Sequence, residues 1–121
     1  MLSIGTIVLG AADVRRAAAF WGQALGYVPR DEVEEDWAVL VPASGTGPGL
    51  ALGLSDTPVQ DHPRVHLDLY ARDAADQAAE VERLVALGAE RVAWDSYPDD
   101  PDFIVLADTE GNRFCVIDTG H

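Results

Sequence analysis

The sequence contains no lysine and only one cysteine, and both shortages limit what the protein can be. All 8 basic residues are arginine, and they face 21 acidic residues, so the formal net charge is −13. Such a surface repels nucleic-acid phosphates and anionic lipid headgroups, so we expect neither a nucleic-acid nor a membrane partner. The lone Cys115 cannot form an internal disulfide, so nothing in the chain requires an oxidising compartment.

Long apolar runs are also missing. A membrane-spanning helix needs about 20 consecutive apolar residues, and no stretch approaches that length. The opening segment MLSIGTIVLGAADV is apolar but lacks the basic leader of a signal peptide. We therefore expect a cytoplasmic protein. The 121 residues, 48% of them hydrophobic, are enough for one domain with a core of its own.

Two segments have the spacing of amphipathic helices, and each carries its own start and stop signals. Each begins at an aspartate suited to an N-cap and stops at a glycine, which in the first helix stands where a left-handed C-cap would lie. These capping residues are Asp13, Asp73, Gly26 and Gly88. The pattern predicts helices over 13–25 and 73–87.

Short strand-like runs separated by turn signals surround both predicted helices. They cover 4–10, 27–33, 37–41 and 50–54 in the first half, and 65–70, 91–94, 103–107 and 113–118 in the second. The order is βαβββ followed by βαβββ, and the caps recur at nearly equal offsets, which indicates an internal repeat. We predict a single α+β domain over 1–121, made of two tandem modules at about 1–56 and 64–121.

Alternation along the predicted strands separates a large apolar face from a mixed one. The apolar face should pack against the helices. The opposite face combines small, polar and apolar side chains, as the lining of a binding pocket does. In the runs 4–10, 50–54, 65–70 and 113–118, this mixed face carries Thr6, Val8, Gly10, Ala51, Gly53, His66, Asp68, Tyr70, Arg113, Cys115 and Ile117.

Three motifs in this order resemble the vicinal oxygen chelate superfamily of glyoxalases, bleomycin resistance proteins and dioxygenases, and within it the glyoxalase-like branch. They are Ala12-Asp13-Val14 through Phe20-Trp21 to Leu25-Gly26-Tyr27, then Val65-His66-Leu67-Asp68-Leu69 with Leu87-Gly88-Ala89, and finally Asp108-Thr109-Glu110-Gly111-Asn112-Arg113-Phe114-Cys115-Val116. Thr109 stands where the superfamily usually has proline. The resemblance implies mixed, curved sheets that form a half-barrel cavity, with the helices outside.

The resemblance also implies where a metal would bind. The superfamily's ligand positions fall here on Thr6, Gly53, His66 and Cys115, of which Thr6 is a poor ligand and Gly53 has no side chain. Asp68 shares a face with His66 and Cys115 and could complete a three-ligand set, the usual number for catalytic zinc. We nevertheless expect no metal and no other cofactor, because two of the four expected ligands are missing.

The candidate ligand-binding residues are Thr6, Trp37, Gly53, His66, Asp68, Tyr70, Arg113 and Cys115. His66 and Asp68 are also candidates for catalysis, since a carboxylate beside an imidazole fixes its tautomer and supports acid–base chemistry. The alternative for His66 is a buried histidine held by hydrogen bonds within the sheet. Arg113 either binds an anionic group or forms a surface ion pair.

Other side chains have less distinctive interpretations. We expect Cys115 to behave as a small buried apolar residue, and Phe20 and Trp21 to pack in the core. Trp94 and Phe103 could line a pocket with Trp37. The acidic segment 97–102 is interpreted as a solvated connection, and His62 and His121 as solvated side chains.

Three functions are consistent with these residues. The first is metal-independent binding of a small molecule, such as sequestration of a drug or metabolite. The second is a lyase, isomerase or dioxygenase of the same superfamily that uses His66. The third is an accessory domain with a vestigial cavity. Because open-edged sheets leave strand edges to cover, we also expect a homodimer.

Overall fold

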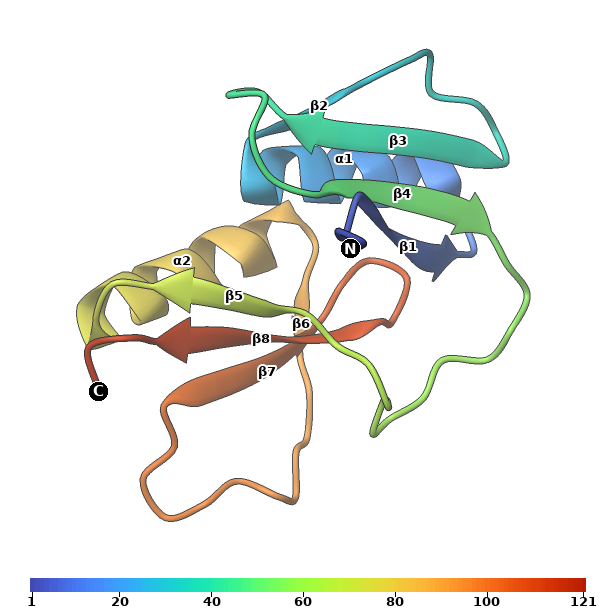
Figure 1. The fold of residues 1–121 in the computed structure, drawn as a ribbon. Coiled ribbons are helices and arrows are strands. Elements are labelled where there is room, and N and C mark those ends of the chain that lie inside the picture. The colour runs from blue at the N-terminus through green and yellow to red at the C-terminus, as the bar shows by residue number, and fades with distance from the viewer. The chain divides into compact units, whose positions relative to one another are not determined.

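The computed structural model describes all 121 residues, and these divide into two compact units, Met1–Pro58 and Val59–His121 (Figure 1). Each unit contains one helix and one four-stranded sheet, which confirms the α+β class and the two tandem βαβββ modules. The first unit comprises β1 (Thr6–Ala11), α1 (Val14–Leu25), β2 (Tyr27–Pro29), β3 (Trp37–Pro42) and β4 (Gly49–Leu54). The second comprises β5 (Asp68–Ala71), α2 (Ala74–Leu87), β6 (Glu90–Arg91), β7 (Phe103–Ala107) and β8 (Arg113–Asp118).

The sheet of the first unit has the strand order β1-β4-β3-β2, in which β1 pairs with β4 in parallel and the other pairs are antiparallel. Helix α1 packs against β2, β3 and β4 and buries Val14, Ala17, Phe20 and Trp21. The rings of Phe20 and Trp21 meet edge to face with centroids 5.1 Å apart. The core position expected for both aromatic residues is confirmed.

The second unit repeats this topology with the order β5-β8-β7-β6 and a parallel β5·β8 pair. Helix α2 packs on β5 and β8, where its buried Val81 and Leu84 belong to a core that also includes Leu106 and Phe114. Helix α2 covers one face of this sheet and leaves the other available. Partners in the parallel pair point their side chains to the same side of the sheet.

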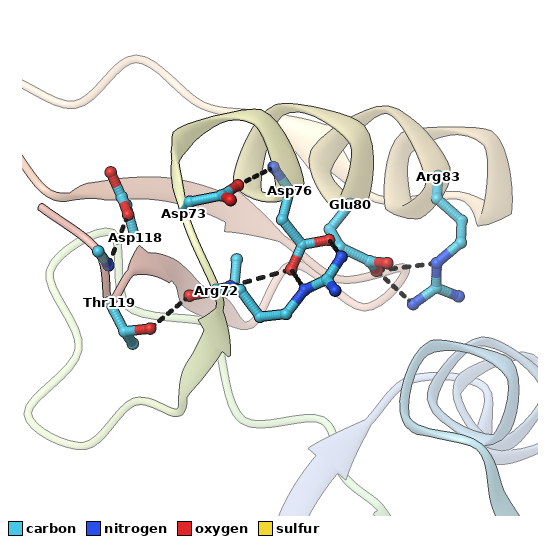
Figure 2. A network of polar contacts seen from close by, with 9 residues as sticks. Arg72, Asp73, Asp76, Glu80, Arg83, Asp118 and Thr119 are labelled. Atoms are coloured by element: carbon cyan, nitrogen blue, oxygen red, sulfur yellow. Dashed lines mark hydrogen bonds and ion pairs between the residues drawn. The ribbon is translucent and has the colours of Figure 1, made fainter.

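Side-chain capping fixes where α2 begins (Figure 2). The Asp73 carboxylate accepts a hydrogen bond from the Asp76 amide at 2.8 Å, and the Asp76 carboxylate accepts one from the Arg72 amide at 2.9 Å. Asp73 thus satisfies a backbone donor that the first turn leaves unpaired, and Asp76 reaches back to the residue that precedes the N-cap. The amide and the guanidinium of Arg72 together lower the pKa of Asp76. Both helices start after the aspartates that the sequence indicates.

Several strands are shorter than predicted. The run expected over 27–33 ends at Pro29, and the run expected over 91–94 is the two-residue β6. The most consequential difference concerns His66, which was expected in the middle of a strand. It lies ahead of β5, because the pairing of β5 with β8 begins only at Asp68 and Cys115, where the Cys115 amide donates a hydrogen bond to the Leu67 carbonyl.

Neither helix has the length and apolar character that crossing a membrane requires. This agrees with the absence of long apolar runs from the sequence.

The two C-cap glycines differ in what a side chain would meet, and this difference yields a stability prediction. Gly26 has φ 67° and Gly88 has φ 123°. A Cβ at Gly26 would touch nothing within 4 Å, whereas one at Gly88 would lie 2.9 Å from Cγ2 of Thr109. We expect Gly26→Ala to lower the free energy of unfolding by about 1–2 kcal/mol through backbone strain alone.

Gly88→Ala should lower the free energy of unfolding further, as measured by urea titration, because its Cβ also clashes with Cγ2 of Thr109. Replacing Thr109 by serine removes Cγ2, so the double variant Gly88→Ala, Thr109→Ser should recover the excess loss. Equal losses for Gly26→Ala and Gly88→Ala, with no recovery, would contradict this account.

Candidate functional site

The face of the second sheet opposite α2, called the open face below, gathers the polar residues singled out in the sequence. Asp68 is the partner of Cys115 across the β5·β8 ladder, and Tyr70 is the partner of Ile117. Partners share a face, so all four side chains lie on one side. The β7·β8 register adds further members, and the open face carries Asp68, Tyr70, Phe103, Val105, Ala107, Arg113, Cys115 and Ile117.

A cavity of about 540 Å³ lies against this face, within the range of small-molecule sites. Its floor comes from β5, β7 and β8. Its walls come from the segments that precede β5 and β7. The lining residues are His62, Pro63, His66, Asp68, Tyr70, Trp94, Ser96, Asp102, Phe103, Val105, Arg113, Phe114, Cys115 and Ile117.

Asp68 is the centre of the polar group in this cavity. Its Oδ1 atom lies 3.0 Å from Nε2 of His66, and it accepts a hydrogen bond from the thiol of Cys115. The side chains of His66 and Asp68 are 43% and 47% exposed. The buried-histidine alternative for His66 is therefore wrong, because its ring lies ahead of the strand, where the sheet does not cover it.

Cys115 is buried, as expected for a small apolar residue. Burial is the main reason that its pKa rises from 9.0 to about 11, and the negative charge of Asp68 adds to the effect. A thiol with this pKa is protonated at neutral pH and is a weak nucleophile. Its chemical role in the cavity is thus that of a hydrogen-bond donor to Asp68.

The same three side chains form the candidate metal-binding set. One nitrogen, one oxygen and one sulfur atom of His66, Asp68 and Cys115 lie within 4.8 Å of one another. Their number and type suit a zinc site. The thiol must lose its proton to become a ligand, however, and its raised pKa opposes that loss. The positions of the three donor atoms therefore suit a divalent cation, but the protonated thiol of Cys115 does not.

The segment 59–64, called the leading segment below, forms an outer wall of the cavity. Asp61 Oδ1 lies 3.0 Å from the Arg113 guanidinium, and His62 Nε2 lies 3.0 Å from Asp95 Oδ1. The His62 ring also stacks on Trp94 with centroids 4.6 Å apart. The bond from His62 lowers the pKa of Asp95. These contacts attach the leading segment to β8 and to the loop before β7.

The structure therefore brings together His66, Asp68, Tyr70, Arg113 and Cys115 from the sequence-based candidates. The ion pair expected as the alternative for Arg113 is present, although its side chain also lines the cavity. Trp94 and Phe103 line the cavity too. The sequence missed His62 and Asp102, which had been interpreted as solvated loop residues.

Thr6, Trp37 and Gly53 belong to the first unit, where they share the sheet face opposite α1. A Cβ at Gly53 would lie 3.4 Å from the ring of Trp37, its partner across the β3·β4 ladder. The small residue thus makes room for the indole. Val8 and Trp37 are 57% and 44% exposed, so this face presents apolar surface without any ionisable group of its own.

Comparisons with known proteins agree with this fold. The family model described as a glyoxalase-like domain matches residues 6–117. A glyoxalase-related enzyme from Fulvimarina pelagi has a similar structure, with a TM-score of 0.72 and 21% identity over 97% of this chain and 88% of that chain. A lactoylglutathione lyase from Agrobacterium tumefaciens has a TM-score of 0.63 and 20% identity over 98% and 95% of the two chains.

A genomically encoded fosfomycin resistance protein from Listeria monocytogenes has a TM-score of 0.74 and 16% identity over 98% of this chain and 91% of that chain. At such identities these similarities show the fold alone. No curated protein sequence matches the chain.

The pKa of Cys115 yields a prediction about its reactivity. Alkylation by iodoacetamide in the folded protein should begin only well above pH 9, because the pKa is about 11. Asp68→Asn removes a charge that raises this pKa, so the rate profile should shift to lower pH. Asp102→Asn, at another cavity carboxylate, is the matched control and should leave the profile in place.

Because the folded state favours the protonated thiol, the free energy of unfolding should also fall as the pH rises from 9.0 towards 11. An unchanged alkylation profile in Asp68→Asn would show that Asp68 does not act on the thiol.

Proposed function

Because the chain belongs to the glyoxalase-like domain family, we propose that it binds a small organic molecule, without a metal ion, in the cavity on its second sheet. Sequestration of a drug or metabolite is the function that this implies. The observation that carries the proposal is the cavity of about 540 Å³ itself, which joins aromatic walls to a few polar groups. That combination gives a ligand both contact area and orientation.

The size of the cavity also bears on the accessory-domain alternative. A vestigial site would be filled by its own side chains, whereas this space is open and Tyr70 projects into it with 79% of its surface exposed. An aromatic side chain that is left uncovered on a sheet face offers a ready surface for a flat ligand.

Metal independence is supported by the contacts among His66, Asp68 and Cys115, whose potential ligand atoms interact with one another. Asp68 is engaged by both His66 and Cys115, and the thiol keeps its proton at neutral pH. In the first unit, the superfamily's ligand positions fall on Thr6 and Gly53, which supply no strong ligand. A bound ion would have to displace two hydrogen bonds and a proton.

The second candidate is an enzyme of the lyase, isomerase or dioxygenase type, and the His66–Asp68 contact of 3.0 Å is the observation that favours it. A carboxylate at this distance orients the imidazole for proton transfer. Such an enzyme would need either a bound metal or a substrate proton within reach of His66.

One set of measurements on the purified protein separates these functions. In a thermal-shift screen of metabolites, a ligand at 100 times its dissociation constant should stabilise the protein by about 2.7 kcal/mol. Ser96→Trp places a bulky ring in the cavity from an exposed loop position, so it should abolish that shift while the sheet stays intact. Thr57→Trp, at an exposed position of the first unit, should leave the shift unchanged.

Metal content is measured on the same samples, prepared without chelator. We expect well under one equivalent of zinc, manganese, iron or nickel. Stoichiometric metal that is lost in His66→Ala would instead establish the metalloenzyme, and a full ligand shift in folded Ser96→Trp would move the binding site elsewhere.

A homodimer remains our proposal for the quaternary state. Edge strand β1 spans Thr6–Ala11, and its residue Val8 is one of several exposed apolar side chains. Strand edges and apolar patches of this kind are commonly covered by a second copy. Sedimentation at micromolar concentration should give a species near twice 13.0 kDa, and a species of 13.0 kDa alone would refute the dimer.

A further inference from the structure

One arginine, Arg113, lines the cavity, and an acidic residue of the same chain already neutralises its charge. The Arg113 guanidinium lies 3.0 Å from the Asp61 carboxylate and donates a second hydrogen bond to the Gly111 carbonyl at 2.8 Å. Its side chain is only 18% exposed. An anionic ligand would therefore have to compete with Asp61 for a partly buried cation.

The remaining charges of the cavity are negative. Asp68 and Asp102 line it, and Asp95 lies beside its wall residue His62. The Asp102 carboxylate takes part in no salt bridge: its backbone carbonyl accepts hydrogen bonds from Gln77 and the Asp118 amide, and its negative charge adds to that of Asp100 in raising the pKa of His121. Around a ligand-sized space, carboxylates thus outnumber the one guanidinium, and the negative potential favours a positive guest.

The apolar walls of the cavity suit a flat guest. Tyr70 stands on β5, and Phe103 begins β7, where its ring packs on Tyr97 with centroids 5.2 Å apart. Trp94 also lines the cavity, and its ring is in contact with that of His62. Aromatic faces attract cations electrostatically as well as providing apolar area. The carboxylates and the aromatic rings of the cavity therefore both favour a positively charged ligand.

We propose that the ligand of this cavity is a flat organic cation, and that Asp61 sets this preference by occupying Arg113. The inference rests on the proposed function, because it assigns a charge class to the same site. Asp61 acts as a specificity-determining residue. While it is ionised, the guanidinium is closed to anions and the cavity keeps its negative potential.

Three probes with one ring system test the charge preference in the full chain. Naphthylmethylammonium, naphthylmethanol and naphthoate are titrated by calorimetry at low ionic strength, and the affinities should fall in that order. We expect the cation to bind at least about tenfold more tightly than the anion, and added salt should narrow the difference.

The variants identify the groups responsible. Asp102→Asn should weaken the cation severalfold and leave the neutral alcohol unchanged. Asp61→Asn should release Arg113 and raise the affinity for naphthoate, whereas Asp61→Glu should restore exclusion of the anion. Asp99→Asn, an exposed acid that does not line the cavity, is the matched control and should alter none of these affinities.

Circular dichroism confirms that each variant is folded before its affinities are compared. Tightest binding of naphthoate by the unaltered protein would overturn the proposal, and so would equal affinities for all three probes, although the cavity would then still be a binding site. Absence of binding by every probe would overturn this inference, whereas the proposed function is overturned only if the thermal-shift screen also finds no ligand.

Discussion

In a parallel pair of strands, residues that are partners across the ladder project to the same side, and in the second unit this places Asp68 next to Cys115. The rest of the site depends on that register. A shift of one residue would send Asp68 to the face that α2 covers, where an ionised carboxylate without partners costs several kcal/mol. The α2 crossover imposes the parallel pairing, and the capping of α2 by Asp73 determines where β5 ends.

The contacts that enclose the cavity are of a different kind from those that form its floor. The floor consists of sheet residues held by backbone ladders and by the core beneath them. The leading segment is held by one ring stack and two ion pairs, and its Asp61 and His62 side chains remain largely exposed. Contacts to exposed side chains contribute little individually. Such a wall can adjust to a guest at small cost, whereas the floor keeps the polar groups of Asp68 and Cys115 in place.

The two units share a fold but differ in the chemistry of their available faces. In the first, Val8, Trp37 and Gly53 present an apolar surface, and the small residue accommodates the indole. In the second, Asp68 and Arg113 add charge, and Cys115 adds a protonated thiol. The two units therefore repeat one topology, but only the second has ionisable side chains on its available sheet face. The side chains can differ because neither the core nor a turn constrains these positions.

Local patterns in the sequence determined the helices, their caps and the alternation of strand faces, because each depends on residues close together in the chain. Asp13 and Asp73 start the helices, Gly26 and Gly88 follow them, and Asp68 shares a face with Cys115 as predicted. The family resemblance, now confirmed by the match over residues 6–117, followed from the same short motifs.

The tertiary structure alone decided what surrounds that face. Asp61 meets Arg113 and His62 meets Trp94 across long separations in sequence, through loops with no periodic pattern to predict their course. It also decided that His66 lies outside its strand, because β5 pairs with β8 only from Asp68 onwards. Composition and spacing describe single segments, whereas charge balance and protonation in a cavity depend on which segments the fold brings into contact.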